Sequence, residues 1–196
     1  MIQTSEAIVI ASQKYGDSSK IATFFTKDFG IIKAIAKGSF QIKSKYGSAL
    51  EVLSYVNINF YSKPEGHLQL LSDAEIVRPY YNLSKSFEHI TVGFALCETI
   101  LKTLDEHYKN PLIFQNFAQS LNLLDNLPSN PSNILIKFLF DSARILGFGI
   151  NLNNGQEKNK SNNLNKQKYF LNLDIGDFKI IDNNVNFDAI DRELMN

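Results

Sequence analysis

The stretch YVNINFY (residues 55–61) decides the fold of the first part of the chain. Apolar side chains occupy every second position, at Val56, Ile58 and Phe60, and side chains with polar groups fill the positions between them. A period of two is typical of an antiparallel β-strand with one face toward a core and the other toward solvent. Residues 55–61 should therefore belong to a sheet whose other strands lie nearby in the sequence.

Four further segments have strand character because they are rich in β-branched and aromatic residues. They are residues 6–11, 20–26, 31–37 and 68–77. Turn signals separate them, notably KDFG at residues 27–30, where Gly30 can adopt a positive φ, and KPEGH at residues 63–67. Five short strands at this spacing predict a small barrel or a sandwich.

After Pro79 the apolar period changes to that of α-helices. The first predicted helix carries a stripe of Phe87, Ile90, Phe94, Cys97, Leu101 and Leu104. The second should begin with Asn110 as its cap and Pro111 in its first turn. Its stripe is Phe114, Phe117, Leu121 and Leu124. A third helix over residues 131–146 is apolar on most sides, so we expect it to be the central and most buried helix.

The last part of the chain differs in kind. Residues 151–168 are rich in asparagine and lysine, which predicts a low-complexity loop because few apolar side chains are available for a core. Residues 169–181 indicate two short strands around Gly176. The predicted class is α+β, with a five-stranded barrel over residues 1–80 and an all-helical domain over 81–150. The loop over 151–168 then leads to a small β-hairpin and C-terminal segment over 169–196.

Overall composition argues for a soluble protein in a reducing compartment. Basic and acidic residues both number 20, so the net charge is zero, which argues against nucleic-acid binding over the whole surface. The single cysteine, Cys97, excludes an intrachain disulfide. The N-terminus lacks the basic segment of a signal peptide, and no window approaches the ~18–20 consecutive apolar residues of a membrane helix. We therefore expect a cytoplasmic location.

Side chains suited to catalysis are few and scattered. The three histidines, His67, His89 and His107, lack the spacing of a metal site. Asp73 and Glu75 share one face of a predicted strand, but such a pair without a neighbouring histidine is more often solvated than catalytic. The sequence therefore predicts that the chain is not an enzyme.

Positive charge is concentrated in and after one predicted strand. Between residues 29 and 50 there are four lysines, Lys33, Lys37, Lys43 and Lys45, and no acidic residue. Phe40 and Tyr46 lie among them as candidate stacking platforms for bases. Lysines track a phosphate backbone without reading sequence, and an aromatic face accepts any base. A solvated surface loop is the alternative, and composition alone favours it.

Several short motifs occur in a set order along the chain. They are YGDSS at residues 15–19, FT at 25–26, a glycine at 30, AKG at 36–38 and SKYGSALE at 44–51. In this order they resemble the RecO family of DNA recombination and repair mediators. The segments NPLIFQNFAQSLNLLD (residues 110–125) and ILGFGIN (residues 145–151) look like the helical domain of that family. The resemblance covers nearly the whole chain.

The resemblance implies an N-terminal OB-fold barrel, a helical domain and a mediator without catalytic activity. Such proteins bind single- and double-stranded DNA without sequence specificity and anneal complementary strands. They also bind the tail of single-stranded DNA-binding protein, and with RecR they help to load RecA, which implies a cytoplasmic, nucleoid-associated protein. The DNA contacts implied for this chain are Lys33, Lys37, Lys43 and Lys45, with Lys20 as a weaker candidate and the rings of Phe40 and Tyr46 beside them.

One departure from the family concerns a metal. Many members carry a four-cysteine zinc site after the GFG segment, whereas residues 152–176 of this chain contain no cysteine. We therefore predict no zinc and no other cofactor, with the hairpin as a metal-free remnant. The alternative function is a protein-interaction module that docks peptides or subunits, in which the lysines only keep a loop soluble. A subunit of an OB-fold enzyme is a third reading.

Overall fold

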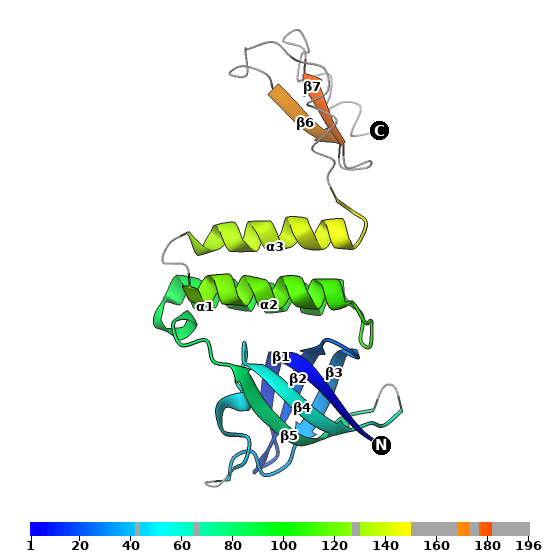
Figure 1. Cartoon of the computed structure of the whole chain (residues 1–196), viewed down its shortest axis with the longest axis vertical. Helices are drawn as coiled ribbons and strands as arrows, with labels where there is room; N and C mark the ends of the chain where they lie inside the picture. Colours follow the sequence, from blue (N-terminus) through cyan, green and yellow to red (C-terminus); the bar gives the residue numbers. More distant parts are fainter. Residues whose placement is uncertain (42–43, 65–66, 127–129, 150–167, 173–176, 182–196) are drawn as a thin grey trace. The chain divides into compact units, whose positions relative to one another are not determined.

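The computed structural model describes residues 1–41, 44–64, 67–126, 130–149, 168–172 and 177–181. It divides into two compact units, Met1–Ser142 and Ala143–Asn196, which are treated separately. In Figure 1 the strands of the first unit run from blue to green-cyan, and its helices follow from green to yellow along the chain.

Five strands form a closed barrel in the order β1-β2-β3-β5-β4. They are β1 (Ile2–Tyr15), β2 (Ser19–Thr26), β3 (Gly30–Ala36), β4 (Tyr55–Tyr61) and β5 (Gln69–Arg78). The barrel closes because β1 pairs antiparallel with both β2 and β4, and β3 pairs in parallel with β5. A five-stranded barrel of this connectivity is an OB-fold. The predicted fold class is thus confirmed.

The alternation that predicted β4 determines which of its side chains face the core. Val56, Ile58 and Phe60 are at most 3% exposed, whereas Tyr61 is 43% exposed. β1 is longer than predicted because its polar end pairs with β2 across a tight turn, as far as Tyr15 opposite Ser19. Those residues are held by hairpin hydrogen bonds and not by burial, so no apolar pattern marks them in the sequence.

Inward-facing side chains from all five strands fill the barrel. They include Ala7, Val9, Ala22, Phe24, Ile32, Ala34, Ala36, Val56, Ile58, Phe60, Leu71 and Ala74. The 3-10 turn η1 (Gly47–Leu50), between β3 and β4, adds Ala49 and Leu50 to the same cluster. The outward-facing side chains of the strands are left for the helices and for solvent.

Helix α1 (Phe87–Thr103) buries a different stripe from the predicted one. Its buried residues are Val92, Gly93, Leu96, Cys97 and Ile100. Phe87, Phe94 and Leu101 of the predicted stripe are 84%, 47% and 42% exposed, so the prediction was wrong for them. It was correct for Cys97 and for Leu104, which follows the helix. The helix has two apolar stripes, and packing selects the one with Gly93. There the side chain of Leu53 comes so close that a Cβ on Gly93 would lie 2.7 Å from its Cδ1.

Helix α2 (Pro111–Asn126) is the central helix. Its buried residues are Ile113, Phe114, Phe117, Ser120, Leu121 and Leu124, which include the whole predicted stripe. The predicted cap is also confirmed, because Asn110 Oδ1 accepts a hydrogen bond from the Ile113 amide at 3.1 Å. The ring of Phe117 lies between two other rings, with centroids 6.3 Å from Phe25 of the barrel and 6.0 Å from Phe138.

Helix α3 (Pro131–Ile145) is not the most buried helix, contrary to the prediction. Its side chains Ile136, Leu139 and Phe140 are 51%, 43% and 50% exposed. Only the face with Ile134 and Phe138 is buried. Apolar residues on most sides predicted burial on most sides, but within the described residues a neighbouring helix covers one side only.

In the second unit, β6 (Lys168–Asn172) and β7 (Asp177–Ile181) form an antiparallel two-stranded sheet. The hairpin expected over residues 169–181 is therefore present. The low-complexity segment predicted over residues 151–168 lies outside the described residues except for Lys168, and so does the C-terminal segment after residue 181. Among the described helices, none combines the length and the hydropathy needed to span a bilayer.

Candidate nucleic-acid interface

The outer face of β3 presents cationic and apolar side chains in alternation. Lys33 and Lys37 are exposed and Ile35 is half-buried, whereas Ala34 and Ala36 lie in the barrel core. At about 3.3 Å per residue, the Cα atoms of Lys33 and Lys37 stand roughly 13 Å apart. This face of β3 is the part of the barrel at which the predicted DNA contacts are presented.

The two β3 lysines differ in their partners. Lys33 donates a hydrogen bond to Glu106 Oε1, in the connection between α1 and α2. Lys37 forms no ion pair with any residue that the structure describes. A phosphate that approaches Lys33 must compete with a carboxylate, whereas Lys37 is available without that competition.

A second cationic group surrounds the ring of Phe40. Lys14 and Lys20 are directly opposite each other on β1 and β2. Their ammonium nitrogens lie 5.9 and 5.3 Å from the centroid of the Phe40 ring, which is 48% exposed. The Phe40 amide donates to the Ser18 carbonyl at 3.2 Å, which ties the loop after β3 to the β1–β2 turn. A half-exposed ring between two ammonium groups is suited to bind a base together with its phosphate.

Lys14 was missed in the sequence, because it lies 23 residues before Lys37 in a polar stretch with no apolar period. The signal that could have found it is the hairpin itself. The turn at residues 16–18 places Lys14 opposite Lys20, so a hairpin predicted here puts the two lysines side by side.

Tyr46 does not offer a stacking face, which corrects the prediction for this ring. It is 5% exposed and belongs to the barrel core, and its hydroxyl donates to the Leu71 carbonyl at 3.0 Å. Burial, and then the charge of Asp73, raises the pKa of Tyr46, in keeping with a structural hydroxyl. Tyr46 is buried because it directly precedes the 3-10 turn η1, whose residues Ala49 and Leu50 pack in the barrel core.

Lys45 is exposed, and its side chain lies over the ring of the buried Tyr46. Its Nζ donates to the Ser72 carbonyl and stands 5.3 Å from the Tyr46 ring centroid. Lys43, the remaining predicted contact, lies outside the described residues.

The fold brings carboxylates to lysines that are free of acidic neighbours in the sequence. Lys20 pairs with Glu51 at 2.7 Å, and its side chain is only 17% exposed. Glu51 is 31 residues from Lys20 and Glu106 is 73 from Lys33. Two of the lysines are therefore paired with glutamates, so this surface is less cationic than the acid-free sequence window suggested.

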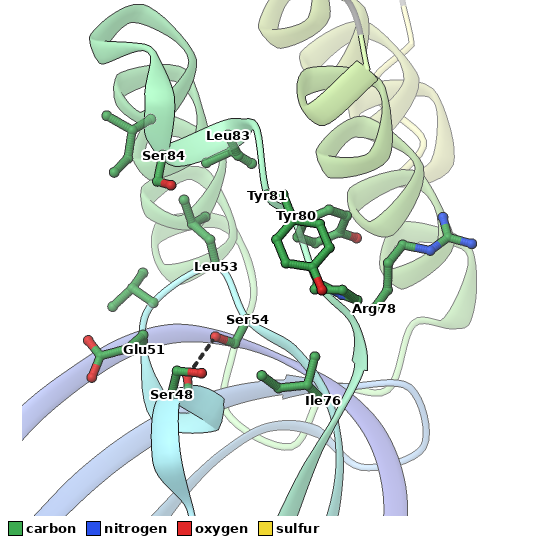
Figure 2. A pocket seen from close by; sticks show the side chains of 13 residues that line it. Ser48, Glu51, Leu53, Ser54, Ile76, Arg78, Tyr80, Tyr81, Leu83 and Ser84 are labelled. Atoms are coloured by element: carbon green, nitrogen blue, oxygen red, sulfur yellow. Dashed lines mark hydrogen bonds between the residues drawn. The ribbon is translucent and has the colours of Figure 1, made fainter.

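A cavity of about 540 Å³ lies between the barrel and the start of the helical region (Figure 2). Its lining is mainly apolar, with Leu53, Ile76 and Leu83 among the side chains drawn. Tyr80 also lines it, and its hydroxyl is buried without a hydrogen-bond partner among the described residues. Burial raises the pKa of Tyr80 to about 12, so the hydroxyl stays protonated and can donate a hydrogen bond. Arg78, also in the lining, donates to Asn122 Oδ1 at 2.8 Å.

Cys97 is a packing residue and not a reactive thiol. It is 3% exposed in α1, and burial raises the pKa of its thiol to about 12. We expect iodoacetamide at pH 8 to leave Cys97 unmodified in the folded chain and to alkylate it in denaturant, where the pKa returns to about 8.5. Mass spectrometry after a timed pulse measures this. Equal labelling with and without denaturant would contradict the buried position.

The prediction that zinc is absent concerns residues 152–176, of which the structure describes only 168–172. In the described parts of the chain, no group of three potential metal-ligating His, Cys, Asp or Glu side chains comes together. The prediction about zinc stays a prediction.

Comparison with known proteins identifies the family. Residues 1–80 match the family described as "Recombination protein O N terminal" and residues 84–176 match "Recombination protein O C terminal". The chain is 32% identical over 146 residues to the DNA repair protein RecO of Salinibacter ruber, a match that spans 74% of this chain and 56% of that protein.

Two further relatives show the same pattern. The DNA repair protein RecO of a Thermoanaerobacter species is 30% identical over 185 residues, which span 94% of this chain and 73% of that protein. For the protein of the same name from Chloroherpeton thalassium, the identity is 28% over 151 residues, 77% of this chain and 58% of that protein. The chain thus spans little more than half the length of several relatives. With both family regions matched in order on a barrel followed by helices, the chain belongs to the RecO family of DNA repair proteins.

Proposed function

We propose that this chain is a non-enzymatic mediator that binds DNA without sequence specificity on the outer face of its barrel and anneals complementary strands. The observation that carries the proposal is the group of Lys14, Lys20 and Phe40, next to Lys37, on an OB-fold of a DNA repair family. OB-folds bind oligonucleotides across strands β2 and β3 and the flanking loops. Lys20 and Lys33 belong to β2 and β3 of this barrel, and Lys14 lies opposite Lys20 on β1, which supports the proposal.

The types of residue account for the absence of sequence specificity. Lysine is a point charge on a flexible stem, so it neutralises phosphates without the bidentate geometry that reads base edges. Phe40 offers a ring face, which accepts any base. DNA binding through such contacts is expected to depend strongly on salt, because each neutralised phosphate releases counterions.

A cationic surface that binds the phosphates of two strands can promote their annealing, because it leaves the base-pairing edges of both strands free. Contacts to phosphate leave the Watson–Crick edges free, and neutralisation reduces repulsion between the two backbones. We propose that the chain acts in this way on strands coated by single-stranded DNA-binding protein, and that together with RecR it helps to load RecA. Its site of action would be the nucleoid.

An annealing assay tests the proposal. Two complementary fluorescent strands are coated with single-stranded DNA-binding protein and mixed with the full chain, with and without RecR, at about 50 mM and about 200 mM salt. We expect annealing to be faster with the chain than without it, and the gain to shrink at the higher salt concentration. No acceleration at either salt concentration would contradict the proposed function.

The cavity in Figure 2 favours a second, compatible function, the docking of a peptide. Its apolar lining suits an aromatic or aliphatic side chain. Arg78 supplies a positive charge beside it, which suits an acidic chain end, and the buried Tyr80 hydroxyl supplies a hydrogen-bond donor. The one carboxylate in the lining, that of Glu51, is paired with Lys20 at 2.7 Å. We propose the acidic, aromatic-ended tail of single-stranded DNA-binding protein as the occupant.

Titration with the fluorescently labelled tail peptide tests the docking function. Tyr80→Phe keeps the ring and removes the hydroxyl, and we expect it to weaken binding of the peptide by about fivefold. Binding of free single-stranded DNA should be unchanged in this variant, since Tyr80 is not part of the cationic face of the barrel. Wild-type affinity for the peptide in the variant would exclude Tyr80 from its recognition.

A further inference from the structure

The barrel wall contains a gap between β3 and β5. Their pairing is limited to Ala34 opposite Gln69 and Ile35 opposite Leu70. Beside the first half of β3, the connection between α1 and α2 takes the place of a strand, because the His107 amide donates to the Ile31 carbonyl at 3.1 Å. Side chains from this connection therefore line the end of the barrel.

Gly30 is what allows the connection to approach so closely. Its φ is +68°, and a Cβ at this position would lie 2.6 Å from backbone atoms of His107 and Tyr108. His107 itself has a φ of +66°, in the left-handed region that costs free energy for a residue other than glycine. Such strain persists where surrounding structure fixes it and is frequent at ligand sites.

Two cavities share His107 as a lining residue. The larger, of about 280 Å³, has Phe29, Ile32 and Phe60 in its lining. The smaller, of about 170 Å³, is lined by Lys33 and Glu106 together with residues of the loop before β5. The larger cavity is thus a recess of mixed character, in which three apolar side chains lie among polar and charged ones, and it adjoins the outer face of β3.

The charged residues of the larger cavity are Lys63, Lys109 and Asp28. Asp28 already accepts a hydrogen bond from Ser5 Oγ at 2.9 Å. Lys63 and Lys109 are exposed, and neither forms an ion pair with a described residue. The recess therefore offers the apolar side chains of Phe29, Ile32 and Phe60 together with two ammonium groups and one carboxylate, a net positive charge.

The backbone at Lys63 and at His67 is anchored from within the barrel. The buried amide of Gln69 accepts from the Lys63 backbone amide at 2.7 Å and donates to the His67 carbonyl at 2.9 Å. The rings of Phe29 and Phe60 meet edge to face, with centroids 5.4 Å apart. The Lys63 backbone and the ring pair of the interior are thus fixed by contacts within the barrel, which reduces the entropic cost of binding there.

We propose that this recess binds one unstacked nucleotide of a single strand, with its base against Phe29 and its phosphate between Lys63 and Lys109. The inference rests on the proposed DNA-binding function and adds to it a preference for single strands. A base that is paired and stacked in a duplex cannot enter a recess. In a single strand, the free-energy cost of moving one base out of its stack is small. The cavity volume, at the lower end for ligand sites, fits one such unit.

The test compares Lys63→Ala/Lys109→Ala with the matched control Lys27→Ala in the full chain. Lys27 is an exposed lysine at the same end of the barrel that pairs with Glu6 and does not line the recess. Fluorescence anisotropy gives the affinities for an oligonucleotide of mixed sequence as a single strand and as a duplex. We expect the double variant to lose about tenfold in single-strand affinity and less than about twofold in duplex affinity. The control should change neither by more than about twofold.

The possible failures can be told apart. If the unmodified chain binds neither form of DNA, both the proposed function and this inference are overturned. If the unmodified chain binds DNA but the double variant keeps its single-strand affinity, or loses both affinities equally, only the inference is overturned. A strand with 2-aminopurine as its base analogue adds a direct readout, since its fluorescence should change on binding to the unmodified chain and not to the double variant.

Discussion

Replacement of both Lys14 and Lys37 by glutamate is expected to weaken binding of single-stranded and duplex DNA alike by at least about thirtyfold at low salt. These two lysines flank the proposed interface and form no ion pair with a described residue. Charge reversal there should therefore lower the affinity for DNA without breaking an ion pair within the protein. The same change at Lys20 or Lys33 would place a glutamate next to Glu51 or Glu106 and mix destabilisation with loss of binding.

The matched control for this variant is Lys85→Glu. Lys85 is an exposed lysine of the 3-10 turn η2 (Leu83–Lys85), so its reversal alters net charge away from the barrel face. Anisotropy titrations with several unrelated sequences measure the effect, and the loss should be the same for all of them. The single variants Lys14→Glu and Lys37→Glu are measured beside it. If Lys85→Glu weakened DNA binding as much as either of them, the net charge of the protein, and not a defined interface, would explain the binding.

Phe117→Ala is expected to lower the free energy of unfolding by about 3–5 kcal/mol, the usual cost of truncating a fully buried ring. Phe117 is 0% exposed and contacts rings of the barrel and of α3, so its removal leaves a cavity that three elements share. For a chain of this size, such a loss lowers the Tm by roughly 6–20 °C. Denaturant unfolding followed by circular dichroism measures it.

Phe94→Ala is the control for that variant, because Phe94 is 47% exposed on α1. Its cost should stay below about 1 kcal/mol, since little apolar surface is re-exposed. Comparable losses in the two variants would mean that Phe94 is buried as Phe117 is, and would restore the stripe predicted for α1 from its spacing.

The barrel could be predicted from the sequence because each strand carries its own signal. The alternation at Val56, Ile58 and Phe60 predicts which side of β4 faces the core, whichever strands lie beside it. The stripe of α2 is equally self-contained, since its apolar residues lie on a single face. The orientation of α1 was not predictable in this way, because its two stripes are equivalent until Leu53 packs against Gly93.

The sequence indicated which lysines are exposed on the barrel but not which carboxylates lie beside them, and their role in DNA binding stays a prediction. Alternation alone placed Lys33 correctly on the outer face of β3, and Lys37 is exposed directly after the strand ends at Ala36. Their partners Glu51 and Glu106 come from elements that only the tertiary fold brings to them. Tyr46 was misassigned because a tyrosine beside lysines suits either a surface or, with its hydroxyl bonded, a core.

The dependence of single-strand affinity on salt tests the central claim most directly. If about four lysines of the barrel face contact phosphates, a plot of log K against log salt concentration for the full chain should fall with a slope near ~3, at ~0.7 counterions per contact. The slope should be the same for unrelated sequences and should decrease by about 1.4 in the Lys14→Glu/Lys37→Glu variant, because two contacts at ~0.7 counterions each are removed. An affinity that does not change with salt concentration would contradict a phosphate-binding surface on this barrel.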